Sequence, residues 1–272
     1  MTYFSFLAYF LLIPLAIMTL LLWRDARHDR QIPVNLDNLR SWIVILLHVT
    51  IAVLYTTPWD NYLVSTRVWW YDPSLVIGLI LGWVPIEEYI FFMLQTILTG
   101  LWLLWLARRL PRSLAWHPSP RMRRWAILLV GLLWLPTPFL LFGRVELTTY
   151  LALILIWALP PLGLQLAFGA DILWRYRRLV VVGFLVPTLY LAIADTFAIH
   201  VGIWSISPTQ TLGIRLPGNL PLEEALFFLM TNLLIVFGIT LALAEESLAR
   251  LPWGKNRLNA QRVLQNVWAG RK

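Results

Sequence analysis

The segment Pro85-Ile86-Glu87-Glu88-Tyr89-Ile90-Phe91-Phe92 recurs as Pro221-Leu222-Glu223-Glu224-Ala225-Leu226-Phe227-Phe228. Each copy opens a long apolar run, where charge is costly and a pair of charges is costlier still. A proline followed by acidic residues is typical of a helix start. The repeat therefore predicts two apolar helices, each with a carboxylate pair at its mouth, and suggests acid–base chemistry on an apolar substrate.

The composition indicates an integral membrane protein, because 59% of the residues are hydrophobic and only 13% are charged. The 16 Trp residues suit a chain that anchors at two membrane interfaces. Apolar runs long enough to span a bilayer, about 20 residues each, predict an all-α membrane fold with seven transmembrane helices. They lie at 3–23, 39–57, 85–107, 124–142, 147–168, 179–200 and 221–244.

The cationic side chains are distributed unevenly along the chain. They concentrate in the loops after helices 1, 3 and 5 and in the tail, whereas the opposite side has only Arg67, Arg144 and Arg215. By the positive-inside rule, the N-terminus is expected outside and the C-terminus in the cytoplasm. The net charge of +8 then reflects topology, and no nucleic-acid partner is expected.

A longer repeat surrounds the two motifs and predicts an internal duplication. Its further matches are Tyr55 with Tyr190, Asp60 with Asp195, Trp69 with Trp204, Pro73 with Pro208, Gly78 with Gly213 and Gly82 with Gly218. We expect a duplicated three-helix unit, formed by helices 1–3 and 5–7, with helix 4 as a linker that keeps the units parallel. The predicted divisions are a first repeat at 1–110, a linker helix in 111–146, a second repeat at 147–245 and a basic tail at 246–272.

The tail is expected to be cytoplasmic. Its apolar residues follow helical spacing, which indicates a helix lying on the membrane surface, and the alternative is a frayed tail. These residues are Ala260, Val263, Leu264, Val267 and Trp268.

The duplication would bring two acidic clusters to one end of the helices. Both Glu pairs open helices that run the same way, and Asp60 and Asp195 are expected to close helices 2 and 6 at that end. Gly82 and Pro85 interrupt the preceding apolar stretch, so 74–84 is expected to be re-entrant or interfacial. The plainer alternative is that first-turn glutamates only satisfy free amides and the helix dipole. The candidate acid–base residues are Glu87, Glu88, Glu223, Glu224, Asp60 and Asp195.

Aromatic residues crowd both motifs. They could form an interfacial belt and pack helices, or they could line a pocket whose rings stabilise a carbocation. Phe91 and Phe92 share the helix face of Glu88 and are the strongest candidates for the second role. The candidate substrate-binding residues are Trp69, Trp70, Phe91, Phe92, Trp204, Phe227 and Phe228.

Several other classes of protein do not fit. Cysteine is absent, and neither His48 nor His200 has a histidine partner at metal-binding spacing, so no metal is expected. The chain has no glycine-rich dinucleotide fingerprint and no P-loop. The only lysines, Lys255 and Lys272, lie in the tail, which excludes a retinal Schiff base within a helix.

The paired motifs at 85–88 and 221–224, the preceding Asp-containing helices and the seven-span layout resemble the membrane-integral, non-flavin lycopene cyclase family. The resemblance covers about residues 1–245 and is to the fused single-chain form. It implies a redox-neutral isomerase that closes a linear carotenoid such as lycopene into a ring, most simply a β ring, without a cofactor. It also implies a bacterial or archaeal cell membrane, with the lipid bilayer and other carotenoid-pathway enzymes as partners.

The residues themselves fit this chemistry. Burial of a carboxyl group in a low-dielectric site raises its pKa, and a neighbouring carboxylate raises it further. A Glu pair near an Asp could hold one proton ready and leave one base free, and which residue takes which role stays open. A proton-coupled transporter of a lipophilic solute and a carotenoid hydratase are the alternatives.

Overall fold

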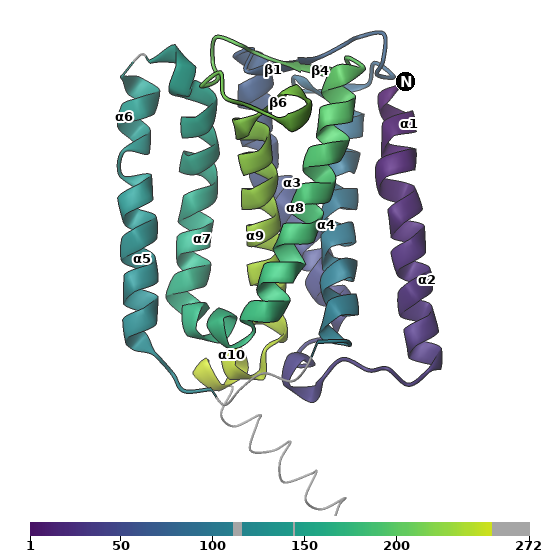
Figure 1. Ribbon diagram of the computed structural model, residues 1–272, viewed down its shortest axis with the longest axis vertical. Coiled ribbons are helices and arrows are strands. Elements are labelled where there is room, and N and C mark those ends of the chain that lie inside the picture. The colour runs from purple at the N-terminus through teal and green to yellow at the C-terminus, as the bar shows by residue number, and fades with distance from the viewer. Residues whose placement is uncertain (111–115, 144, 252–272) are drawn as a thin grey trace, which may run out of the picture.

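The protein is a bundle of long helices in a computed structural model that describes residues 1–110, 116–143 and 145–251 (Figure 1). Seven helical segments within these ranges are long and apolar enough to cross a membrane. The prediction of an all-α membrane fold with seven spans is confirmed. The helices are α1 (Tyr3–Leu7), η1 (Ala8–Leu12), α2 (Ile13–Arg27), η2 (Val34–Leu36), α3 (Ser41–Ser65), α4 (Ile86–Ala107), α5 (Pro120–Trp134), α6 (Thr137–Phe142), η3 (Glu146–Thr148), α7 (Thr149–Arg175), α8 (Arg177–His200), η4 (Pro217–Asn219), α9 (Leu222–Leu243) and α10 (Glu245–Arg250). The strands are β1 (Trp69–Tyr71), β2 (Ile80–Leu81), β3 (Val84–Pro85), β4 (Trp204–Ile206), β5 (Arg215–Leu216) and β6 (Leu220–Pro221).

Several helices run beyond the predicted apolar stretches. α3 continues to Ser65 instead of stopping at 57, so Asp60 lies inside this helix and does not close it. The extension follows from local backbone hydrogen bonding, which an apolar count does not register. The predicted linker helix is broken at Leu135 and Pro136, which lie between α5 and α6.

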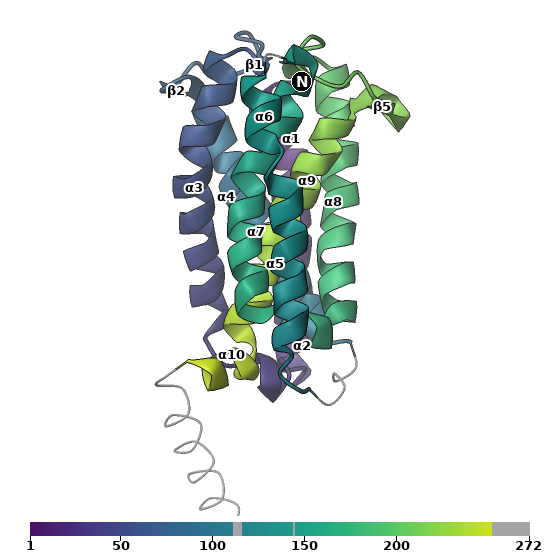
Figure 2. The ribbon, with the colours of Figure 1, turned by 90° about the vertical axis from the view of Figure 1, so that its left-hand side faces the viewer.

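The helices α4 and α9 form the centre of the bundle (Figures 1 and 2). α4 packs against α2, α3, α8 and α9, and α9 also packs against α3, α7 and α8. Polar side chains join the two central helices: Gln95 donates to Thr231 at 3.0 Å and Thr99 donates to Asn232 at 2.7 Å. Such bonds hold helices together where burial of apolar surface gives little preference between lipid and protein.

A short antiparallel ladder, called the roof below, joins the two halves of the chain at one end of the bundle. It pairs β1 with β4, and Trp70 lies opposite Ser205 at its middle. The flanking bonds match each other: Asp72 N–H donates to Ile203 O at 3.0 Å, and Ser207 N–H donates to Val68 O at 2.8 Å.

A tight hairpin precedes each central helix. The hairpin β2–β3 leads into α4 and the hairpin β5–β6 leads into α9. Gly82 and Gly218 turn these hairpins with φ of 72° and 79°, a region that other residues rarely adopt. In the hairpin before Pro85, the side chains of Ile80, Leu81 and Trp83 are exposed, whereas Val84 is buried.

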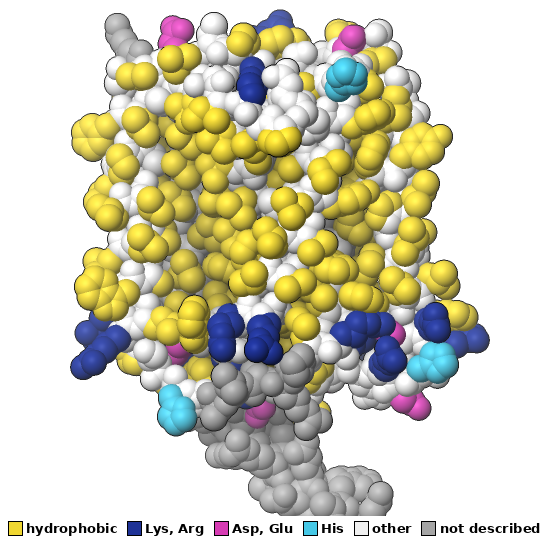
Figure 3. All heavy atoms as spheres, viewed as in Figure 1, with side chains coloured by type: hydrophobic (Ala, Val, Ile, Leu, Met, Phe, Trp, Pro, Cys, Tyr) yellow, Lys and Arg dark blue, Asp and Glu magenta, His cyan; other side chains and the backbone are white. Residues whose placement is uncertain are grey.

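Charged side chains gather at the end opposite the roof, below a broad apolar band (Figure 3). There the buried Asp25 on α2 binds Arg109 through two bonds of 2.6 and 2.7 Å, and Asp171 on α7 binds Arg250. Arg144 and the predicted surface helix from Ala260 to Trp268 lie outside the described residues.

Candidate active site

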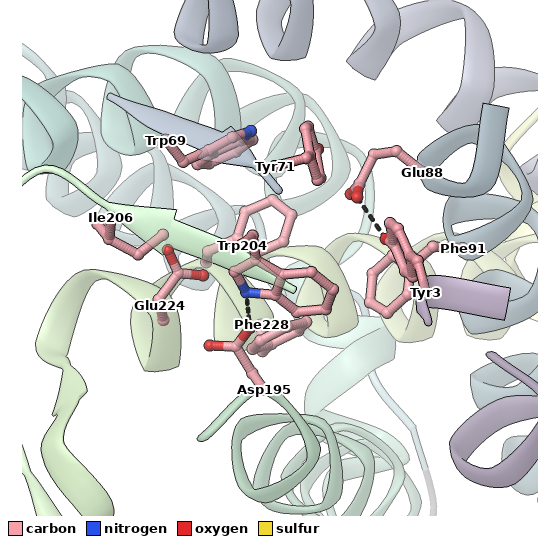
Figure 4. Close-up of a pocket in the computed structure, with 11 residues that line it drawn as sticks. Tyr3, Trp69, Tyr71, Glu88, Phe91, Asp195, Trp204, Ile206, Glu224 and Phe228 are labelled. Atoms are coloured by element: carbon pink, nitrogen blue, oxygen red, sulfur yellow. Dashed lines mark hydrogen bonds between the residues drawn. The ribbon is translucent and has the colours of Figure 1, made fainter. Parts of the chain in front are cut away.

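The second glutamate of each doublet faces a shared cavity under the roof. Glu88 on α4, Glu224 on α9 and Asp195 on α8 line it together (Figure 4). All three carboxyl groups are buried. The centre of a water molecule can occupy about 30 Å³ of this cavity, which is room for one or two waters.

A tyrosine holds the Glu88 carboxyl group. The Tyr3 hydroxyl at the start of α1 donates to Glu88 Oε2 at 2.5 Å. Tyr71 on β1 lines the same cavity as this carboxyl group (Figure 4). Burial and the neighbouring Glu88 raise the pKa of Tyr71 well above its usual value, so this phenol stays neutral.

Glu224 has a matching partner from the second half of the chain. The Tyr150 hydroxyl at the start of α7 donates to Glu224 Oε1 at 2.8 Å. The position that corresponds to Tyr71 is occupied by Ile206 in β4, which cannot donate to the carboxyl group. Each glutamate therefore has one phenol donor, and a second phenol, Tyr71, lines the cavity only on the first strand of the roof.

Trp204 connects the third carboxyl group to the Glu88 side of the cavity. Its indole N–H donates to Asp195 Oδ1 at 2.9 Å, and its ring lies 5.1 Å from the ring of Tyr3. Asp195 is thereby oriented at the cavity wall (Figure 4).

The first glutamate of each doublet holds a loop. Glu87 Oε1 accepts the backbone N–H of Ile77 at 2.7 Å, and Glu223 Oε1 accepts that of Leu212 at 2.6 Å. Both side chains are fully buried, and neither lines the cavity. These bonds tie the hairpin segments to the starts of α4 and α9.

Asp60 is placed differently from Asp195. It is fully buried on α3 but does not line the cavity. Within the described ranges, neither of its carboxyl oxygens has a hydrogen-bond partner, and the same holds for the indole N–H of Trp69. The Trp–Asp bond of the second half thus has no counterpart in the first.

Most of the aromatic candidates surround the cavity. Trp69, Phe91, Trp204, Phe227 and Phe228 line it. Phe92 faces a second pocket that it shares with Phe227, and Trp70 on β1 lines neither.

The tyrosines are the residues that the sequence reasoning missed. Thr2-Tyr3 and Thr149-Tyr150 each stand at the start of a helical span, with Pro14 and Pro161 at the same distance beyond them. This match has a different offset along the chain from that of the acidic motifs, because the linker intervenes. A search for repeats in separate blocks would have found it.

The cavity holds acidic groups without cations. Among the described residues that line it there is no Lys, Arg or His. Moving an ionised carboxylate into such surroundings is costly, whereas a protonated carboxyl group that is hydrogen-bonded costs far less. The arrangement is therefore suited to holding and transferring a proton.

Comparison with known proteins identifies the family. A family model described as lycopene cyclase matches residues 1–106 and 147–242. The lycopene beta-cyclase of Halobacterium salinarum is 44% identical over 195 residues, which make up 71% of this chain and 79% of that protein. The bifunctional lycopene cyclase/phytoene synthase of Gibberella fujikuroi is 37% identical over 202 residues, which make up 70% of this chain and 33% of that longer protein. That of Aspergillus niger is 38% identical over 203 residues, which make up 72% of this chain and 34% of that protein. No solved structure matches significantly. The chain belongs to the lycopene cyclase family.

Proposed function

We propose that this protein closes a β ring at the end group of a linear carotenoid such as lycopene. The observation that carries the proposal is the meeting of Glu88, Asp195 and Glu224 in one buried cavity walled by aromatic rings. The names of the relatives, lycopene beta-cyclase and bifunctional lycopene cyclase/phytoene synthase, support both the substrate and the ring type.

The reaction begins when an acid adds a proton to the terminal double bond of the linear end group. The resulting tertiary cation is attacked by a nearby double bond of the same chain, and a six-membered ring closes. A base then removes a ring proton, and a new double bond forms. One proton enters and one leaves, so the product is an isomer of the substrate and no oxidant or reductant is consumed.

The acid and the base come from the carboxyl groups that face the cavity. One of Glu88 and Glu224 carries the proton, and the other, or Asp195, accepts the proton that the ring loses. Tyr3 and Tyr150 each hold one glutamate in a fixed rotamer through their hydroxyl groups. Positioned acids and bases of this kind typically contribute about 10²–10⁴-fold to a rate.

Aromatic rings stabilise the cation between its formation and the loss of the proton. The faces of Trp69, Phe91, Trp204, Phe227 and Phe228 carry the negative part of the ring quadrupole, which attracts a cation within about 6 Å of the ring centre. Glu87, Glu223 and Asp60 shape the site from behind, because they are buried outside the cavity lining.

The site lies where two duplicated units meet. The units are 1–110 and 147–245, the linker is 111–146, and 246–272 is a basic tail. Support comes from exchanged contacts: Tyr55 on α3 donates to Trp157 O on α7 at 2.8 Å, and Tyr190 on α8 donates to Phe10 O in η1 at 2.9 Å. Both bonds cross from one unit to the other at corresponding positions.

The protein sits in the cell membrane with its roof on the outer side. The apolar band supports contact with the lipid bilayer, and the cationic side chains at the opposite end support a cytoplasmic location for that end by the positive-inside rule (Figure 3). The N-terminus is then outside and the C-terminus is in the cytoplasm. Other enzymes of carotenoid synthesis supply the linear substrate from the same membrane.

The test is expression in a bacterium that accumulates lycopene, followed by chromatography and mass spectrometry of the pigments. Cyclic pigments with the mass of lycopene are expected. A Glu88→Gln/Glu224→Gln double variant, present at the same level in the membrane, serves as the control and should leave lycopene unchanged. Linear pigments heavier by one water would identify a hydratase instead, and unchanged lycopene with the native chain would overturn the cyclase proposal.

A further inference from the structure

A second and larger pocket lies deeper in the bundle than the carboxyl cavity. It is walled by α3, α4, α7 and α9, and a water-sized sphere can move its centre through about 200 Å³ of it. Phe227 lines both spaces. The side chains of Ile51 and Tyr55 at its edge are 52% and 43% exposed, so the pocket opens on the surface that faces lipid.

The two spaces follow one another along α9. Glu224, Phe227, Thr231 and Leu234 recur at helical spacing and share one face of this helix. At 1.5 Å per residue, the distance along the helix axis from Glu224 to Leu234 is about 15 Å. An extended chain could therefore run beside α9 from the carboxyl groups to the lipid.

We propose that this pocket binds the conjugated chain of the linear carotenoid while its end group lies beside Glu88 and Glu224. The inference rests on the proposed function and names where the rest of that substrate lies. The carboxyl cavity alone has room for only one or two waters, so the end group enters it by displacing the Phe227 ring that separates the two spaces.

The walls suit a flat, conjugated chain. The rings of Tyr55, Phe92, Trp157 and Phe227 face the pocket, and aromatic rings pack favourably against other π-systems. Gln165 donates one amide hydrogen to Leu234 O on α9 at 2.9 Å, and within the described residues its buried amide oxygen has no hydrogen-bond partner. The pocket thus offers mainly ring and aliphatic surface to its occupant.

Three positions on the α8 side that correspond to the pocket in the proposed repeat carry buried side chains. In the proposed repeat, Met18 corresponds to Gln165, Leu98 to Leu234 and Asn232 to Thr96. All three of these side chains are buried, and Asn232 is tied to Thr99. We place the path for the chain on the side of α3 and α7 because the pocket with exposed edge residues lies there, although both halves supply carboxyl groups.

The test measures carotenoid binding without turnover. Full-length Glu88→Gln protein is purified in detergent from lycopene-accumulating cells, and its bound carotenoid is measured by absorbance per mole of protein. Ala52→Trp, added to this background, fills the pocket and should lower the bound carotenoid by about tenfold. Ala16→Trp on the exposed face of α2 is the matched control and should have no effect.

A second pair of variants covers the case in which Ala52→Trp does not fold. Ile51→Trp at the pocket edge should lower binding, whereas Val186→Trp at the corresponding exposed position of α8 should not. Equal carotenoid in the Ile51 and Val186 variants, or phospholipid alone in the pocket by mass spectrometry, would overturn this inference. Cyclic pigments from the native chain in that case would leave the proposed function intact, so the two failures are distinguishable.

Discussion

Exchanging each glutamate of the first doublet for glutamine separates two roles that look identical in the sequence. Glu88→Gln removes the transferable proton from the cavity but keeps an oxygen that can accept from Tyr3. Loss of a positioned acid or base should lower the rate by about 10²–10⁴-fold with little effect on folding. Glu87→Gln keeps the oxygen that accepts from Ile77, so most of the activity and stability should remain.

A third variant tests the structural role of the first position. Glu87→Leu leaves the Ile77 N–H without its partner, which should destabilise the protein by about 1–3 kcal/mol. Rates would be measured on purified protein in liposomes with lycopene, and stability by thermal unfolding in detergent. Full activity in both Glu88→Gln and Glu224→Gln would remove the acid–base assignment, and complete loss in Glu87→Gln with normal stability would reverse the two roles.

Three further outcomes are expected. Tyr150→Phe should reduce stability by about 1–3 kcal/mol in thermal unfolding and slow the reaction, because a buried bond to Glu224 is lost; an unchanged melting temperature and rate would contradict this. Gly218→Ala should destabilise the protein, because the backbone at this position has φ of 79° and a Cβ would lie 2.4 Å from Thr196 Cγ2. Gly131→Ala on α5 is the control, because a Cβ there meets open space. Equal melting temperatures of the two variants would refute the strain argument. Because both glutamates line one cavity, any bicyclic product should follow a free monocyclic one in a time course, and a bicyclic product that appears without it would argue against a single site.

The repeated acidic doublets predicted from the sequence two of the three carboxyl groups that line the cavity. The apolar runs predicted the seven spans, and the repeated doublets selected all four glutamates, of which Glu88 and Glu224 lie in one cavity. The repeated aspartates were also selected, but only Asp195 lines that cavity. Trp204 donates to Asp195, whereas Trp69 and Asp60 share no such bond. The side-chain rotamers that decide this difference leave no pattern in the sequence.

The division of labour within each doublet could not be predicted either. Adjacent residues on a helix point about 100° apart, so one of them faces the cavity while the other faces the preceding loop. Which is which depends on where the hairpin packs, and Ile77 and Leu212 fix that through single backbone bonds. Tyr3 and Tyr150 were not predicted as site residues, because they lie far from the acidic motifs in the chain and contact them only in the folded bundle.

The central claim is that a buried carboxyl group gives its proton to the substrate, and isotope incorporation tests it most directly. Protein in liposomes is equilibrated in heavy water, supplied with lycopene and stopped after limited conversion, and the pigments are analysed by mass spectrometry. The account predicts one deuterium in the product for each ring formed, and unlabelled residual lycopene. Cyclic product without deuterium would show that the ring closes without proton donation from an exchangeable acid and would contradict the mechanism.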